Sequence, residues 1–427
     1  MLGVGLVFLV LLLFIFLGFP IFMSVVITAV VFIVAMGIPF SLVIIKMFGS
    51  VNSFALMAIP FFIVAGNIMM QSRITDKLVN FADALVGSFR GGLGHVNILA
   101  SMLFGGIQGS GAADAAAIGG MLIPAMEKQG YDKDYAVAVT AGSAMLSPII
   151  PPSIAMILYS YYTGAPVGLL FLGGILPGIL IGAGQMAANF FMYKHRKYDI
   201  PLTPFTCSGL VRAFYHSFWA LIMPFIILCG IVFGFVTPTE SGVLAIVYGL
   251  FYGFFISGRL RMAQLPGILL DSAITTSVVM MTISAAGVLS NVLVRMRFQN
   301  EVLALAMEVI QGPIAATLFI MAVLLVLGCF LDPTVLIAMF GPTIFALGNA
   351  LGFDPIHYGV LMVVVMQVGA ITPPVGTFLF IACGVAGLPL EKSVKPLMPF
   401  LLVIIAVILL AIFVPEIITL IPGWFSA

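Results

Sequence analysis

The stretch SPIIPPS, residues 147–153, lies inside an apolar run that extends over 135–160. A proline within a helix removes a backbone hydrogen bond and clashes with the preceding turn, so two adjacent prolines unwind a spanning helix. Carbonyl groups freed at membrane depth are tolerated only inside the protein or in a wet cavity. The carbonyl end of a half-helix suits a cation, and the amide end suits a carboxylate. The stretch therefore predicts a broken helix at a binding site, with a simple structural kink as the alternative.

A similar stretch, AITPPVG at residues 370–376, interrupts the apolar run 357–382. At nearly the same offset, GYD at 130–132 matches GFD at 352–354, and Asp114 matches Asp332. The order of segments also repeats: span, surface helix, hairpin, broken span, span. Two copies of opposite orientation are typical of transporters whose binding sites lie near the bilayer midplane. Chance matches in a chain rich in glycine and proline are the alternative.

The composition is that of an integral membrane protein. Of the 427 residues, 63% are hydrophobic and 7% are charged, whereas soluble domains carry roughly 25% charged residues. The apolar runs are continuous rather than alternating, which argues against a β-barrel. A net charge of +1 gives no indication of nucleic-acid binding. The four cysteines and four histidines lack metal-site spacing, so no transition metal is expected.

Apolar runs of about 20 residues are long enough to cross the bilayer as helices, so the fold class expected is an all-α polytopic membrane protein. Two regions, 94–126 and 313–350, each contain two shorter apolar stretches around an aspartate, which predicts re-entrant hairpins. Two amphipathic stretches, 72–89 and 295–311, predict helices at the membrane surface, although a solvated connector is the alternative for the first. Full spans are expected at 2–19, 21–45, 50–70, 135–160, 167–193, 214–236, 241–258, 272–293, 357–382 and 396–421.

The positions of Lys and Arg predict the orientation. Placing the basic cluster 194–197 in the cytoplasm puts every Lys and Arg on that side except Lys46, Arg295 and Arg297, in agreement with the positive-inside rule. Both termini then lie outside the cytoplasm, the first hairpin enters from the cytoplasm, and the second enters from the opposite side. The predicted division is scaffold helices in 1–71 and 194–293, a first inverted repeat in 72–193 and a second in 294–427.

Two aspartates at the hairpin tips are the candidates for ion binding. An ionised carboxylate in the bilayer costs about 2.5 to 3.5 kcal/mol on insertion scales, so each should face a cavity or a partner. Sodium is a hard cation, and hydroxyl, carboxylate and carbonyl oxygens are suitable ligands. A capping or hinge role is the alternative for each aspartate. We expect two sodium sites, one from Ser110, Asp114, Ser147 and Pro148 and the other from Asp332, Thr334, Gly369 and Thr372.

The roles of three further charged residues remain open. Glu240 follows Thr237 and Pro238 in a predicted outer turn, where capping of the next helix and docking of a partner are equally favoured. Arg295 and Arg297 are rare outward cations that could attract an anion or a partner, or anchor the chain at the membrane surface.

Six motifs are distinctive in combination: LFGG at 103–106, the glycine-rich 109–119, PIIPPS at 148–153, the segment 235–240, FLD at 330–332 and TPPVG at 372–376. Together they resemble the large membrane subunit of the tripartite ATP-independent periplasmic (TRAP) transporters; the periplasm lies on the side where the charge argument places both termini and the entry of the second hairpin. The resemblance covers essentially the whole chain, although Gln108 and Ser147 depart from the smaller residues common at their positions.

The resemblance implies an elevator-type transporter of the bacterial inner membrane, usually driven by a Na⁺ gradient. It also implies two partners, a small four-helix membrane subunit and a periplasmic substrate-binding protein. Because the chain begins at its own first helix, the small subunit is expected to be a separate polypeptide. Substrates of the family are mostly carboxylates, including C4-dicarboxylates and sialic acid. The residues expected to contact the substrate are Ser110, Pro152, Ser153, Asp332, Pro374 and Thr377.

Sodium-coupled uptake of a small carboxylate is therefore the predicted function. A freestanding sodium–dicarboxylate symporter or an ion antiporter of similar architecture is the first alternative, and a channel is another. A membrane enzyme is not expected, because neither His-Glu-x-x-His nor Gly-x-Ser-x-Gly occurs and the aspartates repeat by symmetry instead of pairing in one site.

Overall fold

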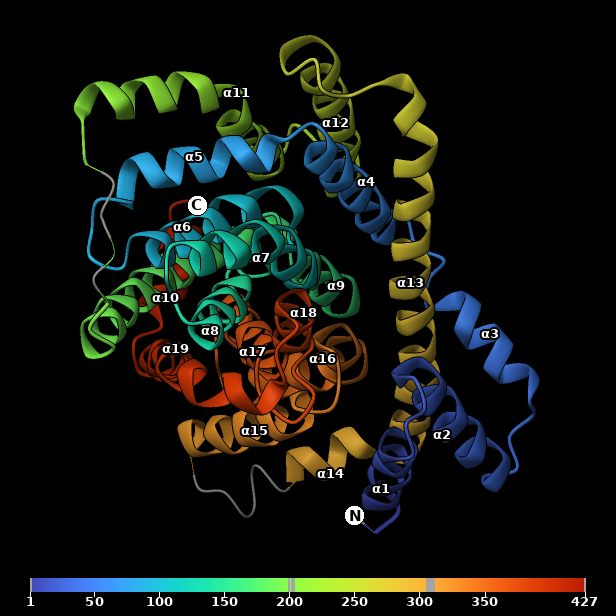
Figure 1. Ribbon diagram of the computed structural model, residues 1–427. Helices are drawn as coiled ribbons and strands as arrows, with labels where there is room; N and C mark the ends of the chain where they lie inside the picture. Colours follow the sequence, from blue (N-terminus) through green and yellow to red (C-terminus); the bar gives the residue numbers. More distant parts are fainter. Residues whose placement is uncertain (1, 199, 201–203, 305–311, 426–427) are drawn as a thin grey trace.

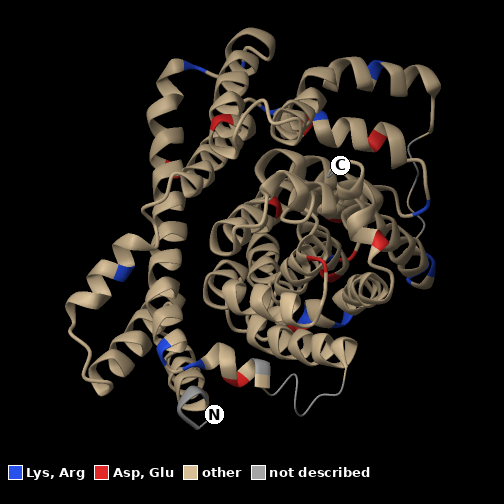
Figure 2. Cartoon of the chain, turned by 180° about the vertical axis from the view of Figure 1, so that it is seen from behind, with Lys and Arg blue, Asp and Glu red and all other residues tan. Residues whose placement is uncertain are grey.

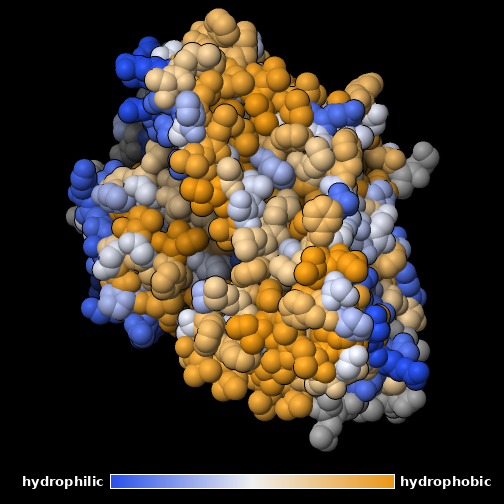
Figure 3. All heavy atoms as spheres, turned by 90° about the vertical axis from the view of Figure 1, so that its right-hand side faces the viewer, coloured by the Kyte–Doolittle hydropathy of each residue, from blue (hydrophilic) through white to orange (hydrophobic). Residues whose placement is uncertain are grey.

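The computed structural model describes residues 2–198, 200, 204–304 and 312–425. Over these residues the chain is helical and contains no β-strand, which confirms the all-α class. Figure 1 shows a compact bundle of short and long helices with a second group of helices around its outside. Charged residues are sparse on the ribbon in Figure 2. Hydrophobic residues cover much of the face in Figure 3, and hydrophilic residues gather mainly toward its margins.

The outer group, here called the scaffold, consists of helices from two separate parts of the chain. The longest, α13, contacts α2, α3 and α4. Short 3₁₀ or π turns precede α4, extend α12 and precede α13. The scaffold helices are α1 (Leu2–Phe16), α2 (Ile21–Ala35), α3 (Ser41–Gly49), α4 (Ala58–Gln71), α11 (Cys207–Val232), α12 (Pro238–Phe251) and α13 (Leu265–Arg295).

The first half of the bundle contains a helical hairpin followed by a helix that breaks at Pro151 and Pro152. Helix α5 lies against both α6 and α11, at the border with the scaffold. The helices are α5 (Ile74–Val86), α6 (Gly92–Gln108), α7 (Gly111–Lys128), α8 (Lys133–Ala144), α9 (Ile154–Thr163) and α10 (Val167–His195).

The second half of the bundle has the same order of elements, with its break at Pro373 and Pro374. Both Pro-Pro peptide bonds are cis. The helices are α14 (Phe298–Ala304), α15 (Pro313–Gly328), α16 (Pro333–Ala350), α17 (Pro355–Gly369), α18 (Thr377–Ala386), α19 (Leu390–Phe413) and α20 (Glu416–Gly423).

The two halves of the bundle interlock. Helix α9, the second part of the first broken helix, packs against α16 of the second hairpin, and α18 correspondingly packs against α7 of the first hairpin. Each broken helix therefore has its second part on the hairpin of the other repeat. The first break is largely buried, whereas the second is partly exposed, with Pro374 at the surface.

Two predicted spans are wrong in extent. The run 21–45 is divided into α2 and α3, because Gly37 adopts a positive φ of 67° and Pro39 follows it. The run 396–421 ends at Phe413, and α20 starts after Pro415, where proline cannot continue the hydrogen bonding of the preceding helix.

Of the two helices predicted at the membrane surface, the described residues include the first in full and only part of the second. The first amphipathic stretch forms α5 within the predicted range. The second forms α14, and its residues 305–311 lie outside the described residues. Six described helices are long and apolar enough to cross a membrane, or seven if a bent pair at α4 and α5 counts as one span. The ten predicted spans exceed this number because several of them are broken or short helices.

Candidate functional site

The tip of the first hairpin is joined to the first helix break by a backbone hydrogen bond. The Ile154 amide, at the start of α9, donates to the Gly109 carbonyl at 3.4 Å. Gly109 has a φ of 63°, and a side chain there would collide with the Pro152 carbonyl. Glycine is therefore required for the hairpin tip to approach the break so closely.

The second repeat contains the corresponding contact. The Val375 amide, just after the double proline, donates to the Cys329 carbonyl at the hairpin tip at 3.2 Å. Where α15 and α17 meet, a Cβ added to Gly328 would lie 2.9 Å from the Gly369 Cα. In both repeats, a hydrogen bond between main-chain groups thus joins a hairpin tip to a helix break.

Asp114 is the most buried of the predicted site residues that carry a charge. It lies in the first turn of α7, has 0% exposure, and neither carboxylate oxygen has a hydrogen-bond partner in the described structure. The hydroxyl groups of Ser101 and Ser147 are its polar neighbours. An enclosed carboxylate without a donor is costly unless a cation or proton accompanies it.

Other polar side chains extend from this carboxylate along the contact between α6 and α8. The Ser147 hydroxyl donates to the Ser101 carbonyl at 3.5 Å, and the Ser101 and Ser143 hydroxyl groups are 3.0 Å apart. The Ser143 hydroxyl donates to Asn97 Oδ1 at 3.0 Å, and Asn97 Nδ2 donates to Thr140 Oγ1 at 2.7 Å. These residues form an oxygen-rich seam inside an otherwise apolar bundle.

The sequence prediction missed four of these positions, Asn97, Ser101, Thr140 and Ser143. The signal was present, since Asn97 and Ser101 are four residues apart on α6, and Ser143 and Ser147 have the same spacing. Residues four apart lie on one helix face. Pairing of the two polar faces could not be predicted from either helix alone.

The remaining predicted residues of the first break are held locally. Ser110 is the N-cap of α7, where its hydroxyl accepts from the Ala113 amide at 3.5 Å. Ser153 is the N-cap of α9 and accepts from the Met156 amide at 3.2 Å. The Ser153 hydroxyl also donates to the Pro148 carbonyl, so that carbonyl already has one partner.

Asp332 differs from Asp114 in its surroundings. It is the half-buried N-cap of α16, and its Oδ1 accepts from the Thr334 amide at 2.9 Å. The capping role considered for this aspartate is therefore present in the structure. Its second oxygen can still face another group.

At the second break, some of the polar groups form hydrogen bonds within the same broken helix. The Thr372 hydroxyl donates to the Val368 carbonyl at 2.8 Å, and the Thr372 amide donates to the Gly369 carbonyl at 3.0 Å. Pro374 is exposed. The Thr377 hydroxyl, at the start of α18, is buried and lacks a partner in the described structure.

The start of α7 in the first repeat lies against the start of α18 in the second repeat. A side chain added to Gly111, beside Ser110, would collide with the ring of Phe378, beside Thr377. The structure therefore brings the predicted contacts Ser110 and Thr377 to neighbouring positions on different repeats. It shows no direct contact between Asp332 and the first hairpin tip among the described interactions.

Two of the charged residues left open by the sequence, Glu240 and Arg295, have local partners. Thr237 and Glu240 form a capping box at the start of α12, with Glu240 Oε2 accepting from the Thr237 amide at 2.7 Å. Arg295 Nε donates to Asn291 Oδ1 one helical turn away at 3.1 Å. The capping role of Glu240 is therefore present in the structure.

Residues 8–417 match the family described as the tripartite ATP-independent periplasmic transporter, DctM component. The chain belongs to the DctM family. This family is a transporter permease and not an enzyme, and with its apolar helices this DctM protein is a multi-pass protein of the inner membrane.

Two curated relatives illustrate the similarity. The C4-dicarboxylate TRAP transporter large permease protein DctM of Pseudomonas aeruginosa is 33% identical over 381 residues, which cover 89% of either chain. The sialic acid TRAP transporter permease protein SiaT of Haemophilus influenzae is 35% identical over 379 residues, which cover 88% of this chain. The latter is a longer protein, and the match spans 61% of its length.

A solved transporter has a similar fold. The YdaH transporter of Alcanivorax borkumensis superposes on this DctM protein with a TM-score of 0.61, covering 86% of this chain and 87% of the other. The sequences are 12% identical, so the likeness concerns the fold alone.

Proposed function

We propose that this protein takes up a small organic carboxylate by symport with Na⁺, using a periplasmic protein to deliver the substrate. The observation that carries the proposal is the pair of helix breaks, each hydrogen-bonded to a hairpin tip, with an aspartate close to either tip. Half-helix ends and free carbonyl groups bind carboxylates and cations in other transporters with internal repeats. The relatives named for C4-dicarboxylate and sialic acid transport support an organic acid as the substrate.

The first sodium site would lie at Asp114. Its two oxygens accept no hydrogen bond within distance limits from the described residues, and the hydroxyl groups of Ser101 and Ser147 are close to them. Ser110 and the Pro148 carbonyl complete the oxygen set expected from the sequence, although Pro148 already accepts from Ser153. A bound cation would neutralise the carboxylate in a medium where an isolated charge is costly.

The second sodium site would lie at Asp332 and Thr334, together with the break at Gly369 and Thr372. Fewer oxygens are free here, because Asp332 caps α16 and Thr372 donates within its own helix. The carboxylate substrate would bind between the sodium sites, contacting Ser110, Ser153 and Pro152 on one side and Asp332, Pro374 and Thr377 on the other.

The transport step would move the bundle relative to the scaffold. Helices α9 and α18 pack on the hairpins of the opposite repeats, so the bundle would move as one unit that carries both breaks. The scaffold, with a small four-helix subunit, would stay fixed in the membrane. A substrate-binding protein would dock on the periplasmic side, where the positive-inside rule also places both termini.

Reconstituted vesicles provide the test. The purified chain, its small subunit and the candidate binding protein are combined, and uptake of labelled sialic acid or succinate is measured with and without an inward Na⁺ gradient. Uptake that requires both Na⁺ and the binding protein supports the proposal. Uptake without any binding protein would instead support a freestanding symporter, and ion flux without solute uptake would support a channel.

A further inference from the structure

An open groove lies between the ends of α10 and α19, away from both helix breaks. Its volume is about 1250 Å³. The two helices approach closely at one part of its lining, where a Cβ added to Gly184 would lie 2.5 Å from the Val403 side chain. From there the groove runs toward the basic ends of both helices, between walls that include Ala188, Phe191 and Leu402.

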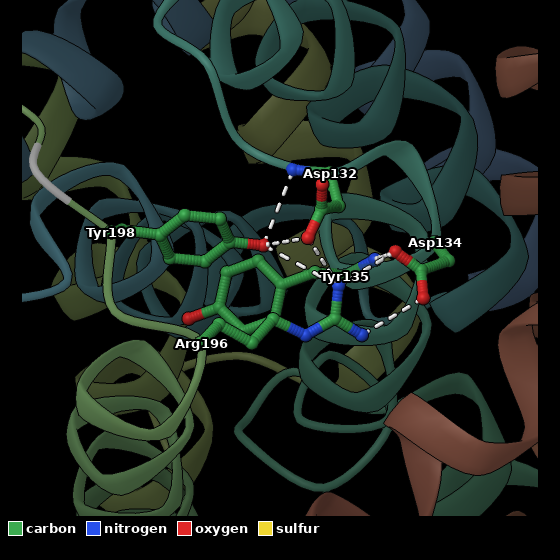
Figure 4. A network of polar contacts seen from close by, with 5 residues as sticks. All are labelled: Asp132, Asp134, Tyr135, Arg196 and Tyr198. Atoms are coloured by element: carbon green, nitrogen blue, oxygen red, sulfur yellow. Dashed lines mark hydrogen bonds and ion pairs between the residues drawn. The ribbon is translucent and has the colours of Figure 1, made fainter.

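The rim of the groove is positively charged. Its charged and titratable lining residues are Asp134, His195, Arg196, Lys392 and Lys395. Arg196 is already paired, because its guanidinium contacts Asp132 at 2.6 Å and Asp134 at 2.8 Å. Figure 4 shows this cluster with Tyr198, which donates to Asp132.

The two lysines remain available to a ligand. Lys392 and Lys395 are exposed, and neither forms an ion pair with another described residue. They stand one turn apart at the start of α19. Because Arg196 is paired with Asp132 and Asp134, the groups of the rim that remain available to a ligand are the two lysine ammonium groups and the imidazole of His195.

The walls of the groove are apolar and open to the surroundings. Phe191 is 67% exposed and Leu402 is 59% exposed, so acyl chains can contact both. Small residues, among them Gly184 and Ala188, leave the space between the helices unfilled. A free phosphate would occupy little of this volume and would leave the apolar walls uncovered.

We propose that this groove binds one anionic phospholipid, with the headgroup phosphate on Lys392 and Lys395 and an acyl chain between α10 and α19. Basic pockets between membrane helices bind anionic lipid headgroups in this way. The lysine stems can lie along the apolar wall while the ammonium groups reach the phosphate. The inference depends only on the groove and stands whether or not the proposed transport mechanism is correct.

Native mass spectrometry of the purified chain in detergent tests the site. Phosphatidylglycerol, phosphatidylcholine and inorganic phosphate are titrated onto the wild type and onto Lys392→Gln with Lys395→Gln. We expect one tightly bound phosphatidylglycerol on the wild type, with affinity about tenfold lower in the double variant because two headgroup charges are lost. The matched control, Arg90→Gln with Lys128→Gln, removes two exposed cations elsewhere and should bind as the wild type does.

A second variant distinguishes lipid binding inside the groove from non-specific attraction of anionic lipid to the basic residues. Ala188→Phe fills the groove without altering its charge and should also lose the single tight lipid, with an unchanged unfolding temperature as evidence of folding. Equal phosphatidylglycerol binding by the wild type and both groove variants would overturn the proposal. So would equal binding of phosphatidylcholine, competition by free phosphate, or loss of the lipid when the small subunit is co-purified.

Discussion

Asp114 combines full burial with two carboxylate oxygens that accept no hydrogen bond within distance limits from any described residue, although the Ser101 and Ser147 hydroxyl groups lie beside them. Ionised carboxylates removed from water cost several kcal/mol unless a counter-charge compensates. Asp332, at the matching position in the second repeat, instead caps α16, because one of its carboxylate oxygens accepts a hydrogen bond from the Thr334 amide. The two aspartates therefore have the same place in the repeats and different local chemistry, which predicts a stronger sodium effect at Asp114.

Asp114→Asn should raise the Na⁺ concentration for half-maximal uptake by about tenfold or more, because the charge of a close partner is typically worth more than 1.4 kcal/mol in a buried site. Sodium titrations of uptake in proteoliposomes measure this. Asp76→Asn is the control, since Asp76 lies on α5 with its side chain 41% exposed, in an ion pair with Arg73. An unchanged sodium titration in Asp114→Asn would remove the first sodium site from the proposal.

Arg196 provides a prediction that depends on pH. Burial raises the pKa of Asp134, but the hydrogen bonds and charge of Arg196 outweigh it and lower that pKa below its ordinary value. The pair therefore contributes stability above about pH 4, the ordinary range for aspartate, and loses it as the pH falls through the lowered pKa. Arg196→Gln should lower the stability by about 1 to 2 kcal/mol at neutral pH.

Unfolding temperatures measured between pH 3 and pH 7 test whether the stabilisation by this ion pair is lost as the pH falls. The difference between the wild type and Arg196→Gln should be largest at neutral pH and should shrink below about pH 4. The exposed Lys128→Gln, which has no ion pair among the described residues, should show no such trend. A difference that grows on acidification would show that Asp134 is not stabilised in its ionised form by Arg196.

At the scale of elements, close backbone contacts connect each hairpin tip to its helix break. In the first repeat, Gly109 combines a positive φ with a carbonyl group directly where a side chain would lie. In the second, Gly328 and Gly369 face one another so closely that neither can carry a side chain. These contacts set the position of both aspartates relative to the breaks.

Gly109→Ala should reduce uptake at least tenfold, because its methyl group would push the Pro152 carbonyl and break the Ile154 contact. Positive φ adds a backbone cost of roughly 1 kcal/mol for alanine. Gly120→Ala on α7 is a matched control, since nothing lies within 4 Å of its added Cβ. Uptake by Gly109→Ala equal to that of the control would show that the tip does not need this approach.

Gly369→Ala tests the second contact in the same manner. Its Cβ would collide with the Gly328 backbone, so α15 must separate from α17 and uptake should be lost. Gly384→Ala on α18 meets nothing within 4 Å and should retain wild-type uptake. Membrane insertion and detergent stability, measured beside uptake, distinguish a local change at the site from failure to fold.

At the scale of the whole molecule, the hairpin tip of the bundle touches the scaffold at a small residue. The Gln108 side chain, at the end of α6, lies against Gly66 of α4, with Gln108 Cγ 2.7 Å from an added Gly66 Cβ. Gln108 is 4% exposed, and its Oε1 has no partner in the described structure. If the bundle moves as a unit, this contact must break in each cycle.

A disulfide across this contact should therefore stop transport. In a chain without its own cysteines, Gly66→Cys with Gln108→Cys is oxidised, and uptake should fall to background and return on reduction. Asn67→Cys with Ser272→Cys is the control, because these residues hydrogen-bond at 2.8 Å within the scaffold. Full uptake by the oxidised Gly66–Gln108 pair would exclude movement at this boundary.

The sequence by itself determined the class of protein and the position of the two breaks. Apolar length and proline chemistry act locally, so they are readable from a short stretch of residues. The same holds for Asp114 and Asp332 near the hairpin tips. Helix lengths were less predictable, as shown by the division of 21–45, where one glycine with positive φ ends a run that is apolar throughout.

Only the tertiary structure decided which segments meet. The exchange of α9 and α18 between repeats, the polar seam of Asn97, Ser101 and Ser143 beside Asp114, and the groove between α10 and α19 all join residues far apart in the chain. Such contacts depend on how helix surfaces fit together, and every helix here offers apolar faces to several neighbours. Hydrophobicity alone does not choose among those neighbours, whereas side-chain shape and backbone approach in the folded bundle do.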